Sequence, residues 1–144
     1  MRILGIDYGD VRVGLALSDV SETLAGGIGT VKITGMKDAV RQIVSVVKEK
    51  QVEKIVLGLP KNMDGSEGAS ASKIRAFAEL LGKELPDVPI SFWDERRTSI
   101  LAADYMSITG TFGQKRKNSV DTLSAEIILQ SFLDHEKNAK GDEN

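Results

Sequence analysis

Residues 36–60, MKDAVRQIVSVVKEKQVEKIVLGLP, carry the pattern that decides the fold class. Within this stretch, residues 40–47 repeat apolar side chains at the three- and four-residue spacing of one helix face. The run KIVLGL at residues 54–59 is short and apolar, and Pro60 ends it because proline cannot donate the next hydrogen bond of a ladder. A helix followed by such a strand predicts an α/β chain with parallel strands.

The segments on either side complete the predicted sheet. Before residue 36, glycine and aspartate turn signals separate three short strands, at residues 2–8, at 12–18 and in a glycine-rich stretch that ends near residue 33. After residue 60, the apolar spacing predicts a helix at 69–85, a strand at 90–93, and helices at 98–106 and 120–136. We therefore expect an α/β fold with a five-stranded mixed sheet, in which a three-strand antiparallel meander adjoins parallel strands and helices flank the whole.

Length and composition limit the domain organisation and the chemistry. The 144 residues suit one domain, which we expect at residues 1–137, followed by a polar, disordered tail at 138–144. The chain has no cysteine and one histidine, His135, which disfavours disulfides, thiolate nucleophiles, zinc–thiolate sites and Ser–His catalysis. Acidic residues number 21 against 19 basic ones. Carboxylates are therefore the main candidates for catalysis.

Charge and hydropathy indicate the compartment and the partners. The net charge of −2 gives no general attraction to nucleic acids, so a nucleic-acid partner needs a local basic patch. No apolar run approaches the roughly 18 residues of a membrane span. Asp7 also interrupts the N-terminal apolar run before any signal-peptide cleavage site. We expect a cytoplasmic protein that does not bind membranes.

Three acidic residues, Asp7, Glu95 and Asp121, are expected to meet at one edge of the sheet. Asp7 lies near the end of the first strand on a core-facing side, and Glu95 follows the strand at 90–93, where ligands of open α/β sheets collect. Asp121 precedes Ala125 by four residues, on the helix stripe that docks against the sheet. Clustered carboxylates repel one another and favour a hard divalent cation. We therefore predict that these acids are catalytic and hold Mg²⁺ or Mn²⁺, as in hydrolysis of a phosphodiester by a nuclease.

Each acid also has an ordinary structural interpretation. Asp7 could start a turn before Gly9, and Glu95 could form a surface ion pair with the arginines that follow it. Asp121 could be a first-turn acid favoured by the helix dipole, with Ser119 as the cap. Any one acid alone is weak evidence, whereas three at convergent positions favour a nuclease site.

Two basic clusters are candidate substrate contacts. Arg96 and Arg97 lie beside the predicted site, and Lys115, Arg116 and Lys117 lie in a long irregular loop shortly before the helix at 120–136. Each cation that neutralises a phosphate adds a salt-dependent increment of affinity, and arginine can engage a phosphate through two donors. For the loop cluster, a merely solvated charge run is the alternative.

Glycine-rich segments leave further alternatives open. Residues 5–14, GIDYGDVRVG, allow a tight hairpin and a close approach of the backbone to a ligand. Residues 58–68, GLPKNMDGSEG, offer Asn62, Asp64 and backbone N–H groups near a helix start, which either bind a phosphate or form a turn. Residues 70–73, SASK, match the Ser-x-x-Lys pattern of penicillin-recognising enzymes, but the companion motifs are missing and we set the match aside.

The segments GIDYGDVRVGLALSD, VLGLPKNMDGSEG, FWDERRTS and KNSVDTLSAEIIL together resemble the YqgF family of Holliday junction resolvase-like proteins, also described as pre-16S rRNA nucleases. The resemblance extends from residue 1 to about residue 133, with the motifs in the family's order. It implies a ribonuclease H-like fold related to the RuvC resolvases, with Asp7, Glu95 and Asp121 at the acidic catalytic positions. It also implies that five further residues lie at motif positions: Arg12, Asn62, Asp64, Arg96 and Thr98.

One departure from the RuvC pattern concerns the last helix. RuvC resolvases carry two acids one turn apart there, whereas Asp121 is followed three residues later by Ser124. A second metal ion would then have fewer protein ligands. Asp10, Asp19 or oxygens of the substrate phosphate could compensate.

The leading hypothesis is a divalent-metal-dependent endonuclease that acts on structured RNA. The resemblance implies that it processes the 5′ end of pre-16S rRNA in the cytoplasm, where the immature small ribosomal subunit could be a partner of a monomer or weak homodimer. The nearest rival keeps the site and changes the substrate to branched DNA, which needs a two-fold dimer for symmetric cleavage. Phosphotransfer, as in the actin and sugar-kinase fold, needs a second domain that 144 residues do not supply. A non-catalytic RNA-binding module is the remaining class, and 5% aromatic residues offer it few stacking surfaces.

Overall fold

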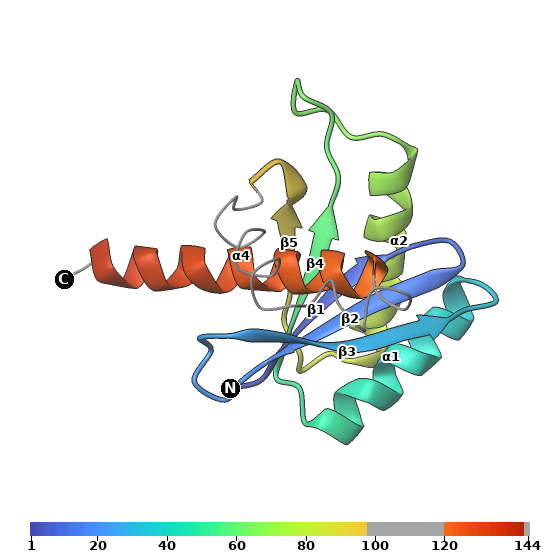
Figure 1. The fold of residues 1–144 in the computed structure, drawn as a ribbon. Helices are drawn as coiled ribbons and strands as arrows, with labels where there is room; N and C mark the ends of the chain where they lie inside the picture. The colour runs from blue at the N-terminus through green and yellow to red at the C-terminus, as the bar shows by residue number, and fades with distance from the viewer. Residues whose placement is uncertain (98–119, 143–144) are drawn as a thin grey trace.

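The computed structural model describes residues 1–97 and 120–142, which form one sheet with helices on both faces (Figure 1). The strands are β1 (Ile3–Tyr8), β2 (Arg12–Ser18), β3 (Ala25–Lys32), β4 (Lys54–Leu59) and β5 (Ile90–Asp94). Their order across the sheet is β3-β2-β1-β4-β5. The pairs β1–β2 and β2–β3 are antiparallel, while β1–β4 and β4–β5 are parallel. The predicted five-stranded mixed sheet is therefore confirmed.

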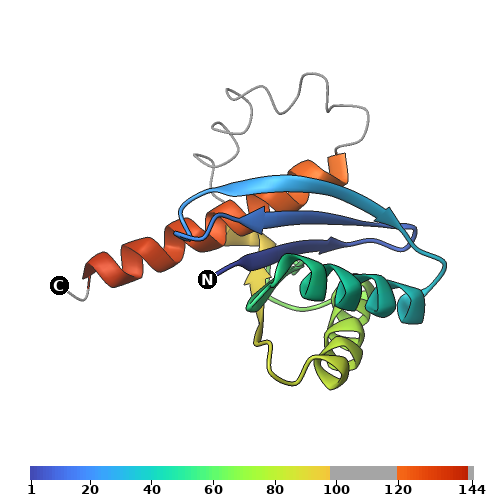
Figure 2. The same ribbon diagram turned by 90° about the horizontal axis from the view of Figure 1, so that it is seen from below.

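The helices divide between the two faces of the sheet. The helices α1 (Met36–Lys50) and α2 (Ala69–Glu84) cover one face, and α4 (Val120–Asp142) crosses the other, as Figure 2 shows. Alternation along β1 sends Leu4 and Ile6 into the core under α1 and α2, and Ile3 into the core under α4. Asp7 shares the face of Ile3, so it belongs to the side that α4 covers.

Glycines allow α4 to lie directly on the strands. A Cβ atom added to Gly5 of β1 would stand 2.7 Å from the Cβ of Leu129. One added to Gly58 of β4 would stand 2.5 Å from the Cδ1 of Ile128, and one added to Gly27 of β3 would clash with two side chains of α4. The sequence suggested that Gly5 leaves room for a ligand, whereas the structure uses that room for the helix.

The end of α4 differs from the sequence expectation. The helix continues through residue 137 to Asp142, so residues 138–142 of the expected disordered tail are helical. Glu136, Lys137 and Ala139 are good helix formers, which favours the longer helix. Residues 143–144 and the helix predicted at 98–106 lie outside the described residues. Within the described ranges, no helix combines the length and apolarity needed to cross a lipid bilayer.

Candidate active site

Asp7 and Glu95 come together at the carboxyl ends of the parallel strands. Asp7 is the second-last residue of β1, and Glu95 begins the short 3-10 helix η1 (Glu95–Arg97) directly after β5. β4 lies between them, and its Gly58 presents no side chain: Oε1 of Glu95 lies 3.4 Å from where a Cβ of residue 58 would stand. Both acids line one cavity of about 200 Å³. The structure thus brings together two of the three predicted acids.

The surroundings of Glu95 disfavour its charged form. Burial raises the pKa of Glu95, and the negative charges of Asp7 and Asp94 raise it further. Carboxylates whose pKa is raised by burial and by a like charge are typical of functional sites.

Asp121, the third predicted acid, is the second residue of α4, and its side chain lies outside the described part of the structure. Ala125 and Ile128, four and seven residues later, are buried against the sheet, as the predicted stripe requires. Ile128 lies against Gly58, beside the strand ends that carry the other two acids. Among the described side chains, no group of three or more acidic or histidine residues is arranged to hold a metal ion.

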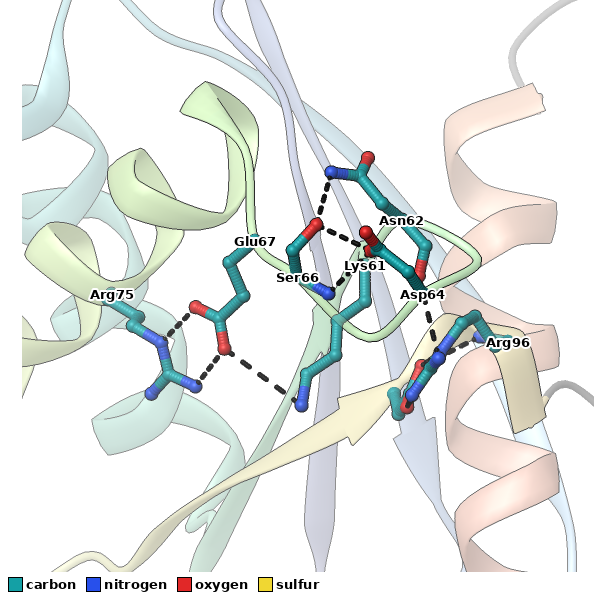
Figure 3. Close-up of polar contacts among 8 residues, drawn as sticks. Lys61, Asn62, Asp64, Ser66, Glu67, Arg75 and Arg96 are labelled. Carbon is teal, nitrogen blue, oxygen red and sulfur yellow. Dashed lines mark hydrogen bonds and ion pairs between the residues drawn. The ribbon is translucent and has the colours of Figure 1, made fainter.

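The loop between β4 and α2 is a self-supported turn (Figure 3). The N–H of Gly65 donates to the carbonyl oxygen of Asn62 at 2.9 Å, and the N–H of Asn62 donates to that of Ser66 at 2.8 Å. Oδ1 of Asp64 accepts from the hydroxyl and the N–H of Ser66, and these two bonds hold the pKa of Asp64 below its usual value. Gly65 has a φ of 89°, in the region that favours glycine. Of the two interpretations left open by the sequence, the turn is the one that the described contacts support.

The side chain of Arg96 links this turn to the end of β5 through hydrogen bonds. Its Nε and Nη2 donate to the carboxylate of Asp94 at 3.1 and 2.7 Å, and its Nη1 lies 3.4 Å from the carbonyl oxygens of Asn62 and Met63. The guanidinium beside Asp94 lowers the pKa of that carboxyl to about 2. Arg96 therefore acts within the chain as a brace between β5 and the turn.

The far end of the same loop is tied to α2. Glu67 accepts hydrogen bonds from Nε and Nη2 of Arg75 at 2.5 and 2.7 Å, and Nζ of Lys61 lies 3.9 Å from the same carboxylate (Figure 3). The loop is thus held by Arg96 through backbone carbonyl oxygens and by the ion pairs of Glu67.

Arg97 points along α4. Its guanidinium lies 5.2 Å from the ring centroid of Trp93, and its Nη2 lies 3.2 Å from Nδ1 of His135. Arg97 therefore packs beside the helix that covers the sheet. Among the other predicted substrate contacts, Arg12 is exposed at the start of β2, whereas Thr98, Lys115, Arg116 and Lys117 lie outside the described residues.

Sequence reasoning considered Asp10 only as a possible extra metal ligand and missed Lys73, which lines the same cavity. Asp10, in the turn after β1, and Lys73, in the second turn of α2, line the same cavity as Asp7 and Glu95. Nζ of Lys73 lies 3.2 Å from Oδ1 of Asp10. The available signal was that Lys73 directly precedes Ile74 of the buried stripe, near the start of a helix that follows a strand end. The Ser-x-x-Lys match, set aside as a chance pattern, contains this lysine.

Comparisons with known proteins agree with this fold and this arrangement of motifs. A family model described as "RuvX: Holliday junction resolvase" matches residues 1–135. A protein of Caldanaerobacter subterraneus subsp. tengcongensis named "Putative pre-16S rRNA nuclease" is 45% identical over 141 residues, covering 96% of this chain and 100% of the relative. A protein of Clostridioides difficile with the same name is 41% identical over 138 residues, covering 96% of this chain and 97% of the relative.

Two solved structures with a similar fold are Holliday junction resolvases. RuvC of Thermus thermophilus in complex with a Holliday junction substrate matches with a TM-score of 0.71 and 15% identity, covering 96% of each chain. The yeast mitochondrial Holliday junction resolvase matches with a TM-score of 0.61 and 12% identity, covering 99% of this chain and 84% of that one. At these identities the likeness establishes the ribonuclease H-like fold expected from the sequence.

Proposed function

The chain belongs to the RuvX family, whose model carries the description Holliday junction resolvase, and from this premise we propose that it is a divalent-metal-dependent endonuclease. The observation that carries the proposal is the approach of the Asp7 and Glu95 carboxylates across the bare backbone of Gly58. Asp121 is the proposed third catalytic acid, because it precedes Ala125 and Ile128 of the buried stripe by four and seven residues, and Ile128 rests on Gly58. The reaction is hydrolysis of a phosphodiester bond.

The donor set fits a hard divalent cation such as Mg²⁺ or Mn²⁺. Carboxylate oxygens are the ligands that these ions prefer, and the part of the raised pKa of Glu95 that is due to Asp7 reflects a repulsion that a cation would relieve. Asp7, Glu95 and Asp121 would hold the ion. When bound, it would polarise the phosphodiester and favour a hydroxide nucleophile at neutral pH.

The chain itself supplies a rigid frame for the acids. Asp7 and Glu95 stand at the ends of paired strands, which fix a side chain more accurately than a free loop does. Gly58 leaves the space into which Glu95 leans, and α4 rests on the same glycine through Ile128. Arg96 acts in this scheme as a positioning residue, since its donors hold the turn at residues 62–66 beside the site.

Structured RNA is the proposed substrate, and the 5′ end of pre-16S rRNA is the proposed cleavage site. The names of the relatives from Caldanaerobacter and Clostridioides support this choice. Few aromatic residues are available for stacking, so recognition would rest on phosphate contacts and shape. Arg12, Arg97, Thr98 and residues 115–117 remain proposed contacts to the RNA backbone. The immature small ribosomal subunit in the cytoplasm is the proposed setting.

Branched DNA is the second candidate substrate, favoured by the description of the matching family. Symmetric cleavage of a four-way junction needs two copies of the site related by two-fold symmetry. A solution mass that stays monomeric with junction DNA bound would count against this candidate.

The test is metal-dependent cleavage of two labelled substrates side by side, a precursor 16S RNA 5′ segment and a four-way DNA junction. Asp7→Asn should abolish cleavage with little change in the folded state, because it removes one charge and no volume. Asp87→Asn, an exposed aspartate after α2, is the matched control and should cleave normally. Cleavage of the RNA alone that depends on Asp7 supports the proposal. Cleavage of the junction alone would make branched DNA the substrate in place of RNA. Equal cleavage by native protein and Asp7→Asn would exclude this site, and no cleavage of free RNA or of immature ribosomal particles would exclude the activity.

A further inference from the structure

The cavity that Asp7 and Glu95 line also contains a cation that no assigned role explains. Lys73 reaches into this region from α2 and meets Asp10 of the β1–β2 turn, with Nζ 3.2 Å from Oδ1. Among the described residues that line the cavity, Lys73 is the only cation, while Asp7, Asp10 and Glu95 are its acids. A negatively charged substrate entering this cavity needs compensating positive charge close by.

The neighbouring cations of the described chain are engaged elsewhere. Arg96 donates to Asp94 and to the turn after β4, and Arg97 packs on Trp93. Lys61 lies 3.9 Å from Glu67, on the α2 side of the loop. Lys73 is therefore the cation best placed to meet a phosphate over the two carboxylates.

A phosphate can replace Asp10 as the ion-pair partner of Lys73. The side chains of Lys73 and Asp10 are 55% and 71% exposed, and such exposed pairs are weak because water and salt screen them. A phosphodiester oxygen offers the same charge as the Asp10 carboxylate. A bound nucleic acid can therefore compete with Asp10 for the ammonium group.

We propose that Lys73 binds a backbone phosphate next to the scissile bond. In the free protein Lys73 forms its ion pair with Asp10, and this pair breaks when RNA binds. This assignment rests on the proposed nuclease function and names a substrate contact of that same site. The rival explanation is a purely structural tie, in which the pair joins the β1–β2 turn to α2 and contributes only to stability.

Binding is the decisive measurement, because it requires no cleavage. Fluorescence anisotropy with the labelled RNA segment, in EDTA and across a salt series, is compared for native protein, Lys73→Ala and Lys73→Arg. Lys83→Ala is the control, since Lys83 is an exposed lysine at the other end of the same helix. We expect Lys73→Ala to weaken binding about five-fold and to reduce the salt slope by about 1, while Lys73→Arg restores most of both. Lys83→Ala should match native protein.

A double-mutant cycle tests the part played by Asp10. Asp10→Asn should tighten RNA binding when Lys73 is present and should have a smaller effect in the Lys73→Ala background, because the competition is then gone. If the effects of Asp10→Asn and Lys73→Ala on the free energy of RNA binding are strictly additive, the proposed competition between Asp10 and the RNA phosphate is wrong. An unchanged salt slope in Lys73→Ala, or an equal fall in Lys83→Ala, would overturn the phosphate contact, and a loss of thermal stability with unchanged binding would establish the structural tie. Absence of cleavage by native protein would instead overturn the nuclease function, which this binding assay does not measure.

Discussion

Replacing Gly58 by alanine should separate the packing role of that residue from its role in the site. The new Cβ would stand 2.5 Å from Cδ1 of Ile128 and 3.4 Å from Oε1 of Glu95. The first contact is a clash with the end of a flexible side chain, which can rotate away. The second is at the short end of ordinary contacts, so Glu95 can keep its present position, but its carboxylate can no longer move toward the strand when a metal ion or substrate binds.

The expected effect on stability is small and the expected effect on activity is large. Crowding of this kind costs about 1 to 3 kcal/mol, and replacing a strand glycine returns about 0.5 to 1 kcal/mol. We expect a net loss of about 1 kcal/mol, which lowers the melting temperature by about 4 °C in a chain of this size. A shift of the Glu95 carboxylate by about 1 Å would reduce the cleavage rate about 100-fold.

A second substitution distinguishes the two causes. Ile128→Val removes the Cδ1 atom that the new methyl group meets, so the double variant should recover stability relative to Gly58→Ala alone. Its cleavage rate should stay low, because the contact with Glu95 remains. Calorimetry and single-turnover cleavage of the RNA segment measure the two quantities. Normal cleavage by Gly58→Ala, or recovery of cleavage together with stability in the double variant, would show that the space above residue 58 is not what positions Glu95.

Three further outcomes follow from the same contacts. Gly5→Ala should destabilise more than Gly58→Ala, by about 2 kcal/mol, because its Cβ meets the Cβ of Leu129 at 2.7 Å and a helix carbonyl oxygen at 3.2 Å; an unchanged urea midpoint would contradict this. Asp94→Asn should lower the free energy of unfolding by about 1 kcal/mol at pH 7. The lowered pKa of about 2 implies a larger loss, but water screens this partly exposed ion pair. Because the carboxylate of Asp94 stabilises the fold above its ordinary pKa of 3.8, the difference from native protein should shrink as the pH falls from 4 toward 2, and a constant difference in urea titrations would refute the link to Arg96. Glu95→Gln should abolish cleavage but raise the melting temperature at pH 7 in EDTA. The reason is that the raised pKa of Glu95 makes its charged form destabilise the fold at any pH above its ordinary pKa of 4.5. A lower melting temperature at pH 7, or a gain that persists well below pH 4.5, would contradict this prediction.

Periodicity was sufficient for the sheet and for the helix faces. The alternation in β1 correctly placed Asp7 on the face that a helix covers, and the spacing from Asp121 to Ala125 correctly identified the stripe of α4 that is buried. These features depend on residues near one another in sequence, where the repeat of a strand or helix fixes which side faces the core. The position of Glu95 after β5 followed from the same reasoning.

Contacts between distant segments were beyond that reasoning. Asp10 and Lys73 are 63 residues apart, and their pairing depends on how α2 sits beside the β1–β2 turn. The expectation that Arg96 contacts substrate stays a prediction, and its contacts in the free protein, with Asp94 and two carbonyl oxygens of the turn after β4, could not be predicted from local patterns. For the glycines of residues 5–14 the sequence left a hairpin and a ligand approach open, because nothing local reveals that Leu129 occupies the open side of Gly5. Each of these depends on three-dimensional packing, which periodicity does not encode.

The crossing of α4 over the sheet has a consequence for synthesis of the protein. β1 and β5, with the two described acids, precede α4 in the chain, so the sheet can pair before the helix has left the ribosome. Until then Ile3, Val56 and Trp93 lack the cover that α4 gives them, and the proposed third acid is absent. Docking of α4 would therefore protect the second core and complete the catalytic site in a single event. A nascent chain beside ribosomal RNA would carry no activity until that event.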